Sequence, residues 1–435
     1  NQVLSIYFIF LQKLYPSVFL AFPHFALWRP RRAFDSVRGP VKTPGTPQCK
    51  MGKLYFHFRG GKTPLPMIKF NIYYIYFGDA GGIMHKLTGG QQIFMDFFRI
   101  LAALFVVVGH SFSFYQITAL KNQDYFPYIQ NIGVVMLFLL SGFLTAYSLT
   151  AKNQNRDYKF PAFVKHKAIR IAGEYLPALA LIAFIDYLAI KLNGANYGYH
   201  ASYNVKQFLG NLFMLQDTAV NYIPKLEIVP FGSGRPLWTL SIEWWLYLLF
   251  AYIFLIMVNR ETLTLKKSFL FFVLLLFPTD YIITGRGGGL GFVFLLGVLA
   301  YYIHGRITKK AALCILPFSV AAYILYGLAF KEAYTVPSFL LLWTSFCSCL
   351  KIAESWNVNR NAVLAFLSQS TFMLYLIHYS IIDLIYNADI AADIYCKFAA
   401  GIGFSILLSL VMYSVFGKHI RAVIQKALPD GRSTS

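Results

Sequence analysis

The stretch FMDFFRILAALFVVVGH, residues 94–110, holds an arginine and a histidine within a mostly apolar run. Arg99 and His110 are eleven residues apart. On an α-helix this spacing is about three turns, so both side chains would project from one face, about 16 Å apart along the axis. Ionisable side chains within a membrane are costly, and they commonly face a bundle interior or a water-filled cavity with a function. The pattern therefore predicts a site with a cation near one end and an imidazole, able to move a proton, near the other.

Each of these residues has a simpler interpretation that stays open. Arg99 alone could extend to the membrane interface, where its charge would be hydrated. Asp96 lies three residues before Arg99, so the two could pair on one helix face. His110 lies deep in the apolar run, which favours a functional role over an interfacial one.

Two further segments place polar side chains at a similar depth. LWTLSIEWWLYLLF, residues 237–250, carries Ser241 and Glu243, and STFMLYLIHYSII, residues 370–382, carries Tyr375 and His378. A carboxylate buried alone is costly, and a histidine partner would offset that cost and orient the imidazole. We expect Glu243 and the two histidines to meet in one cavity, although interfacial placement of Glu243 and His378 is the alternative.

The composition indicates the membrane that these segments would span. Hydrophobic residues make up 57% of the 435 residues and charged residues 13%, about half the fraction usual in soluble domains. The apolar runs are continuous, so they predict an all-α, polytopic helical membrane protein rather than a β-barrel. The net charge of +21 is better explained by basic loops and anionic lipid than by nucleic acid. About ten transmembrane helices are predicted, near residues 94–114, 131–150, 170–190, 238–258, 268–284, 289–304, 311–330, 335–350, 362–384 and 397–416.

Basic residues in the loops predict the orientation. With the start of the first span in the cytoplasm, the cytoplasmic loops and tail hold 18 Lys and Arg, and the opposite loops hold 7. Positive loops face the cytoplasm, so both termini are predicted to be cytoplasmic.

Among the five cysteines, Cys347 and Cys349 would point to opposite faces of a helix, and we predict neither a disulfide framework nor a metal site.

The chain divides into three parts. Residues 1–83 hold eleven Lys and Arg and no Glu in segments rich in Pro and Gly, and we expect a basic extension there that is non-native or mis-assigned. A genuine membrane-associating segment is the alternative. Met84 would suit a cytoplasmic start. Residues 84–417 are the predicted membrane domain, and residues 418–435 a basic cytoplasmic tail.

Four segments resemble motifs of the acyltransferase 3 family, and the resemblance covers about residues 93–416. DFFRILAALFVVVGH is similar to the family's first helix, FLLSGFL at 138–144 to its second, LWTLSIEWWLYLLF to its W-S-L-x-x-E segment, and TFMLYLIH to its ninth-helix motif. Each motif alone is weak, but the four occur in the family's order. Where the family has an R-x-x-R pair on the second cytoplasmic loop, VKHKAIRI offers Lys167 and Arg170, and Lys cannot give the bidentate phosphate contacts of Arg.

The resemblance implies an acyltransferase in the bacterial cytoplasmic (inner) membrane. It would move an acyl group, by default acetyl, from cytoplasmic acyl-CoA to a hydroxyl of an extracytoplasmic glycan or lipid-linked sugar. Arg99, Lys167 and Arg170 would bind the donor phosphates, and His110 would be the general base or, as the alternative, a transient acyl carrier. Glu243 or His378 would orient it, with Asp96, Ser241 and Tyr375 in support. A proton-coupled transporter or exporter using the same charges is the competing hypothesis, and a purely structural or partner-binding subunit is a third.

Overall fold

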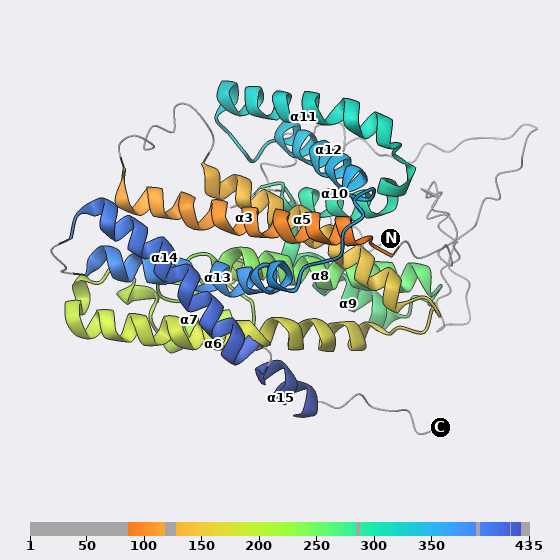
Figure 1. Ribbon diagram of the computed structural model, residues 1–435. Helices are drawn as coiled ribbons and strands as arrows, with labels where there is room; N and C mark the ends of the chain where they lie inside the picture. Colours follow the sequence, from red (N-terminus) through yellow and green to blue (C-terminus); the bar gives the residue numbers. More distant parts are fainter. Residues whose placement is uncertain (1–85, 118–127, 284–287, 389–391, 418, 428–435) are drawn as a thin grey trace, which may run out of the picture. The chain divides into compact units, whose positions relative to one another are not determined.

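The computed structural model describes residues 86–117, 128–283, 288–388, 392–417 and 419–427. These residues form α-helices joined by short turns and 3₁₀ segments, without strands in the described ranges. The fold is therefore that of an all-α, polytopic membrane protein, as predicted (Figure 1). The expected basic extension, residues 1–83, lies outside the described residues.

Each of the ten predicted spans coincides with a helix. Eight helices in the described part of the chain are long and apolar enough to cross a bilayer; the helix from Leu290 is shorter. The helices are α3 (Gly89–Tyr115), α5 (Ile129–Lys152), α6 (Phe160–Asn193), α8 (Leu237–Val258), α9 (Leu265–Ile283), α10 (Leu290–Ile303), α11 (Lys309–Phe330), α12 (Val336–Ala353), α13 (Ala362–Asn387) and α14 (Ile394–Met412), with shorter α7 (Val205–Leu212) and α15 (His419–Ala427).

Helix α6 begins ten residues earlier than the predicted span. Pro161 occupies its first turn, where proline needs no hydrogen-bond partner and its fixed φ suits a helix. No further proline follows until Pro177, which lies inside the helix. Lys167 and Arg170 therefore lie on the first turns of a helix rather than in a loop before it.

Helix α3 lies at the centre of the packing, against α5, α12, α13 and α14 (Figure 1). Small residues allow close approach: a Cβ added to Gly133 of α5 would lie 2.6 Å from the Ala102 carbonyl oxygen of α3. In the same way, Gly142 of α5 and Gly297 of α10 bring those two helices together. Close backbone contact between helices through glycine is typical of membrane bundles.

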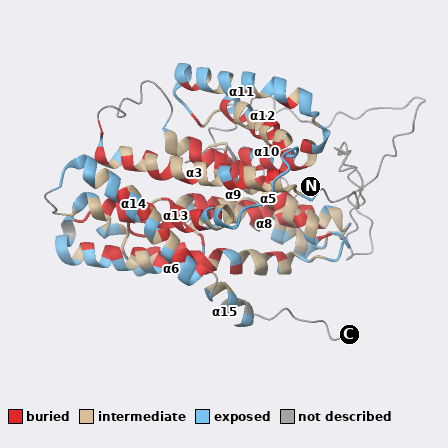
Figure 2. Cartoon of the chain, viewed as in Figure 1, coloured by how far each residue is buried: buried red, intermediate tan, exposed pale blue. Residues whose placement is uncertain are grey.

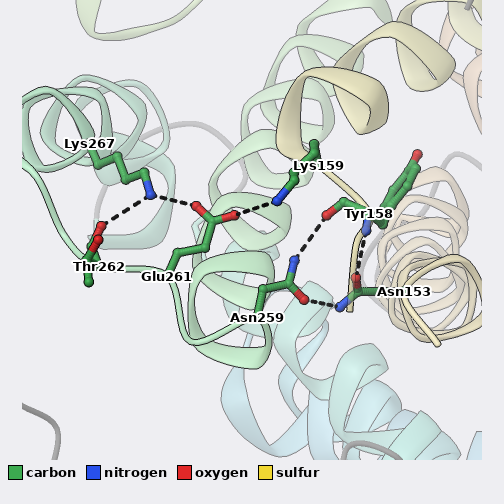
Figure 3. A network of polar contacts seen from close by, with 7 residues as sticks. All are labelled: Asn153, Tyr158, Lys159, Asn259, Glu261, Thr262 and Lys267. Atoms are coloured by element: carbon green, nitrogen blue, oxygen red, sulfur yellow. Dashed lines mark hydrogen bonds and ion pairs between the residues drawn. The ribbon is translucent and has the colours of Figure 1, made fainter. Parts of the chain in front are cut away.

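A polar network joins the ends of four helices (Figure 3). The Asn153 amide after α5 donates to the Asn259 side-chain oxygen after α8, at 2.7 Å, and Asn259 donates to the Tyr158 carbonyl before α6, at 3.1 Å. Beside it, Lys267 of α9 donates to Glu261 at 2.7 Å. These contacts satisfy polar groups where the helices end and fix how those ends meet.

Helix α11 differs from the others in how little of it is buried. Only 11% of the residues in an 18-residue apolar stretch of this helix are buried in the protein, against 72% for the corresponding stretch of α5. It packs mainly on α12, and most of its surface is exposed (Figure 2). In a bilayer this apolar surface would contact lipid tails.

Candidate functional site

One end of the site gathers basic side chains from α3 and α6. Arg99 of α3 is close enough to Arg170 and to Tyr247 of α8 for electrostatic interaction. Lys167, one turn before Arg170, places its ammonium 3.2 Å from the centroid of the Tyr247 ring. A cation over the face of an aromatic ring is attracted by the ring's quadrupole. The three predicted basic residues therefore do lie together, from two helices that are far apart in sequence.

Glu243 belongs to this basic end. Its carboxylate accepts hydrogen bonds from the hydroxyls of Ser141 on α5 and Tyr247, one turn further along α8, and it interacts with the Lys167 charge. These contacts account for its partners, and neither histidine is among them. In the described residues the structure brings Glu243 to Ser141, Tyr247 and Lys167, and it does not bring Glu243 into hydrogen-bond contact with His110 or His378. A half-buried carboxylate is stabilised here by two hydroxyls and a lysine rather than by an imidazole.

Asp96 also pairs with a residue that the sequence did not indicate. Its carboxylate, nearly buried on α3, receives two hydrogen bonds from the Arg360 guanidinium, at 2.6 and 2.8 Å. Arg360 lies between α12 and α13, and its hydrogen bond to Asp96 raises its pKa above the usual value. Asp96 is thus bound to Arg360, and Arg99 is not held in an ion pair with it.

The other end of the site holds a pair of histidines. The rings of His110 on α3 and His378 on α13 lie with their centroids 5.4 Å apart. His378 is fully buried, and its Nδ1 lies 2.9 Å from the Tyr375 carbonyl and 3.1 Å from that of Leu374. Carbonyls only accept hydrogen bonds, so we assign the hydrogen to Nδ1. Nε2, which has no hydrogen-bond partner in the described chain, then presents a lone pair.

An open pocket of about 250 Å³ lies at His110, lined also by Ser113, Phe114 and Tyr379. Its walls are aromatic: Tyr379 packs edge-on against both His110, with centroids 5.2 Å apart, and Phe114, at 4.8 Å. A concave site with aromatic walls and a few polar groups suits a small molecule or part of a larger one. The predicted proton-transfer residue therefore faces a space where a second reactant could lie.

Two predicted supporting residues fix α8 in place. The Ser241 hydroxyl donates to the Met214 carbonyl at 2.8 Å, and the indole of Trp245 donates to the same oxygen at 2.7 Å. Tyr375 of α13 shares a short hydrogen bond with Thr239 of α8. Both interactions attach α8 to its neighbours near its first turns.

Sequence reasoning did not identify Ser141, Tyr247, Arg360 or Tyr379 as site residues. Ser141 carried a signal, because it is the serine of FLLSGFL. Tyr247 lies four residues after Glu243, a spacing that puts both on one helix face. Arg360 and Tyr379 had no comparable signal, since each reaches the site only through packing between distant helices.

The side chains at the site do not form a recognisable set of metal ligands. Within the described ranges, no group of three or more His, Cys, Asp and Glu side chains could hold a metal ion. What the site offers is anion binding at the Arg99 end and proton transfer at the His110 end.

Comparison with models of protein families agrees with the four sequence motifs described above. The model of the acyltransferase domain of the acyltransferase 3 type matches residues 92–414, which include both ends of the site. No curated protein and no solved structure shows a significant match. The family match covers most of the chain and all the helices from α3 to α14. The chain therefore belongs to the acyltransferase 3 family.

Proposed function

We propose that this membrane acyltransferase transfers an acyl group, by default acetyl, from cytoplasmic acyl-CoA to a hydroxyl of an extracytoplasmic carbohydrate. One observation carries the proposal: a single uninterrupted helix, α3, presents Arg99 in a basic cluster at one end and His110 in an open pocket at the other. A reaction with an anionic donor on one side of a membrane and an acceptor on the other needs this arrangement. The glycan or lipid-linked sugar, the acetyl group and the bacterial inner membrane come from the family resemblance.

At the basic end, Arg99, Lys167 and Arg170 would bind the phosphates of the donor. Glu243 faces Lys167 with its carboxylate held by two hydroxyls. We assign Glu243 to orienting Lys167, because its hydrogen bonds go to Ser141 and Tyr247 and its charge lies beside the Lys167 ammonium. The donor's pantetheine arm would extend from this cluster along α3 towards His110, a distance of about 16 Å.

At the pocket, His110 would take the proton of the acceptor hydroxyl as its oxygen attacks the thioester carbonyl. The C–O bond forms, the C–S bond breaks, and the thiolate leaves with the proton that His110 received. His378 lies against His110 with a fixed tautomer, so it would hold the imidazole of His110 and stabilise its charged form.

The test uses the full chain purified into nanodiscs with isotope-labelled acetyl-CoA and a carbohydrate acceptor. We expect release of free CoA thiol and label on the acceptor, both dependent on His110. In cells, mass spectrometry of surface polysaccharide should show acyl groups that disappear when the protein is removed. Proton-coupled transport of a solute without thioester turnover would contradict the proposal and favour the transporter hypothesis.

A further inference from the structure

A second set of buried polar residues lies next to the His110 pocket, outside the machinery described above. Asp186 on α6 and Asp383 on α13 are 0% and 5% exposed. Both carboxylates face the hydroxyl of Tyr197, in the segment between α6 and α8: its oxygen lies 2.7 Å from Asp186 Oδ1 and 3.2 Å from Asp383 Oδ2. Two acidic side chains from different helices thus share one tyrosine.

The charges around this pair do not balance two ionised carboxylates. The Ser233 backbone N–H donates to Asp186 and the Asn387 amide to Asp383, but neither acid forms an ion pair with any described residue. The two acids interact electrostatically with each other and with four tyrosines: Tyr115 of α3, and Tyr197, Tyr199 and Tyr203 of the segment after α6. Arg235 interacts with Tyr199, and it forms no ion pair with either carboxylate.

Two buried carboxylates that contact the same hydroxyl, with no cation paired to either, cost free energy when both are ionised. Aspartic proteases resolve the same problem by sharing one proton between two acids. The hydrogen bonds support one assignment here. The Tyr197 hydroxyl has a single hydrogen, which it gives to the nearer acceptor, Asp186, and its oxygen can then accept a hydrogen from a protonated Asp383.

The pair is connected to the pocket by tyrosines. Tyr199, two residues after Tyr197 and packed edge-on against it, donates its hydroxyl hydrogen to Tyr379 at 3.2 Å. Tyr379 in turn forms a wall of the pocket against His110. Ser233, which donates to Asp186 through its backbone, also donates through its hydroxyl to Ser380, the neighbour of Tyr379.

The segment before α8 closes over the pair. At Gly232 the backbone has φ +53°, and an added Cβ would lie 1.7 Å from Asp186 Oδ2. Only glycine allows the chain to lie this close to the carboxylate in this conformation. Burial and then the charge of Asp186 raise the pKa of Tyr197 above its usual value, so its hydroxyl stays a donor.

We propose that Asp186 and Asp383 hold one proton between them through Tyr197, and that this singly ionised pair positions Tyr199 and Tyr379 at the His110 pocket. The two acids and Tyr197 are therefore positioning residues for the acceptor substrate. This inference rests on the proposed function for its activity measurement only. It predicts that weakening the pair raises the Michaelis constant for the acceptor and leaves the hydrolysis of acyl-CoA without acceptor unchanged.

The first experiment is infrared spectroscopy of the full chain in nanodiscs, which does not depend on any activity. We expect the carbonyl band of a protonated carboxylic acid in the wild type at neutral pH, its loss in Asp383→Asn, and its retention in Asp157→Asn, whose parent residue is exposed. Absence of an acid band that Asp383→Asn removes would overturn the shared proton.

The second experiment compares kinetic constants. Asp383→Asn keeps a donor for Tyr197 and an acceptor for Asn387, so the acceptor KM should stay within about threefold of wild type. Tyr197→Phe loses the bridging hydroxyl and should raise the acceptor KM about tenfold or more, the size of one buried hydrogen bond lost. Acyl-CoA hydrolysis and thermal unfolding are measured alongside.

The outcomes separate this inference from the proposed function. A tenfold rise in acceptor KM in Tyr197→Phe with unchanged hydrolysis supports the positioning role. An unchanged acceptor KM in a folded Tyr197→Phe protein overturns it. If the wild type shows no thioester turnover at all, the proposed function fails, and the infrared band still decides whether the proton is shared.

Discussion

Replacing Arg360 with alanine should impair donor binding, although Arg360 itself is predicted to contact no substrate. Its guanidinium satisfies Asp96 through two hydrogen bonds, one turn before Arg99. Without it, Asp96 would keep a nearly buried negative charge whose closest remaining cation on α3 is Arg99. We expect Arg99 to turn towards Asp96, as the i, i+3 spacing allows. Arg99 would then no longer bind the phosphates of the donor.

The size of the effect follows from the burial of the two partners. Breaking a fully buried ion pair costs about 3–5 kcal/mol, because one charge is left uncompensated. Asp96 is 6% exposed but Arg360 is 37% exposed, so water can replace part of the interaction. We expect a stability loss of about 2 kcal/mol. Losing one charge-assisted bond to a phosphate, about 1.5 kcal/mol, should raise the KM for acyl-CoA about tenfold.

The assay is steady-state thioester turnover in nanodiscs at varied acyl-CoA, with thermal unfolding of each variant. The decisive variant is the double substitution Asp96→Asn with Arg360→Ala, which removes the competing carboxylate and should return the donor KM to within about threefold of wild type. Arg360→Lys keeps the charge without the planar fork and should be intermediate. The reasoning is refuted if the donor KM of a folded Arg360→Ala protein is unchanged, or if the double variant is as impaired as the single one.

Three further results are expected. Arg99→Ala should raise the donor KM at least tenfold and Arg99→Lys should recover only part of it, whereas an unchanged donor KM in both would return Arg99 to an interfacial role. His110→Ala should lower the acylation rate of a folded protein at least about 10²-fold, with the exposed His200→Ala as control; retention of a tenth of the rate would exclude it as the general base. Ser141→Ala should lower the free energy of unfolding by about 1–2 kcal/mol, measured against the exposed Ser414→Ala, and equal stability of the two would argue against its bond to Glu243.

The helices and the shared face of Arg99 and His110 could be predicted from the sequence because both depend on local periodicity. Ten apolar runs became ten helices, and eleven residues on one helix fix a spacing regardless of what packs around it. The start of α6 was missed because Lys and Arg in its first turns reduce hydropathy without breaking a helix.

Partners across helices were harder to predict, for a physical reason. Asp96 has one candidate cation three residues away and binds another that is 264 residues away. Glu243 has hydroxyls within reach on α5 and on its own helix, and these are its hydrogen-bond partners in the described residues. Apolar periodicity shows which face of a helix is buried, but it does not show which neighbour that face meets.

The sparse burial of α11 implies that the protein's resistance to local opening is unevenly distributed. A helix that packs mainly on one neighbour draws little stability from the protein and most of it from the surrounding lipid, whereas α3 and α5 are held by several helices. In detergent, amide hydrogens of α11 should exchange with solvent long before those of α3. Unfolding of α11 alone in a harsh detergent would then leave the bundle around α3 folded, so partial unfolding of the protein need not mean loss of its centre.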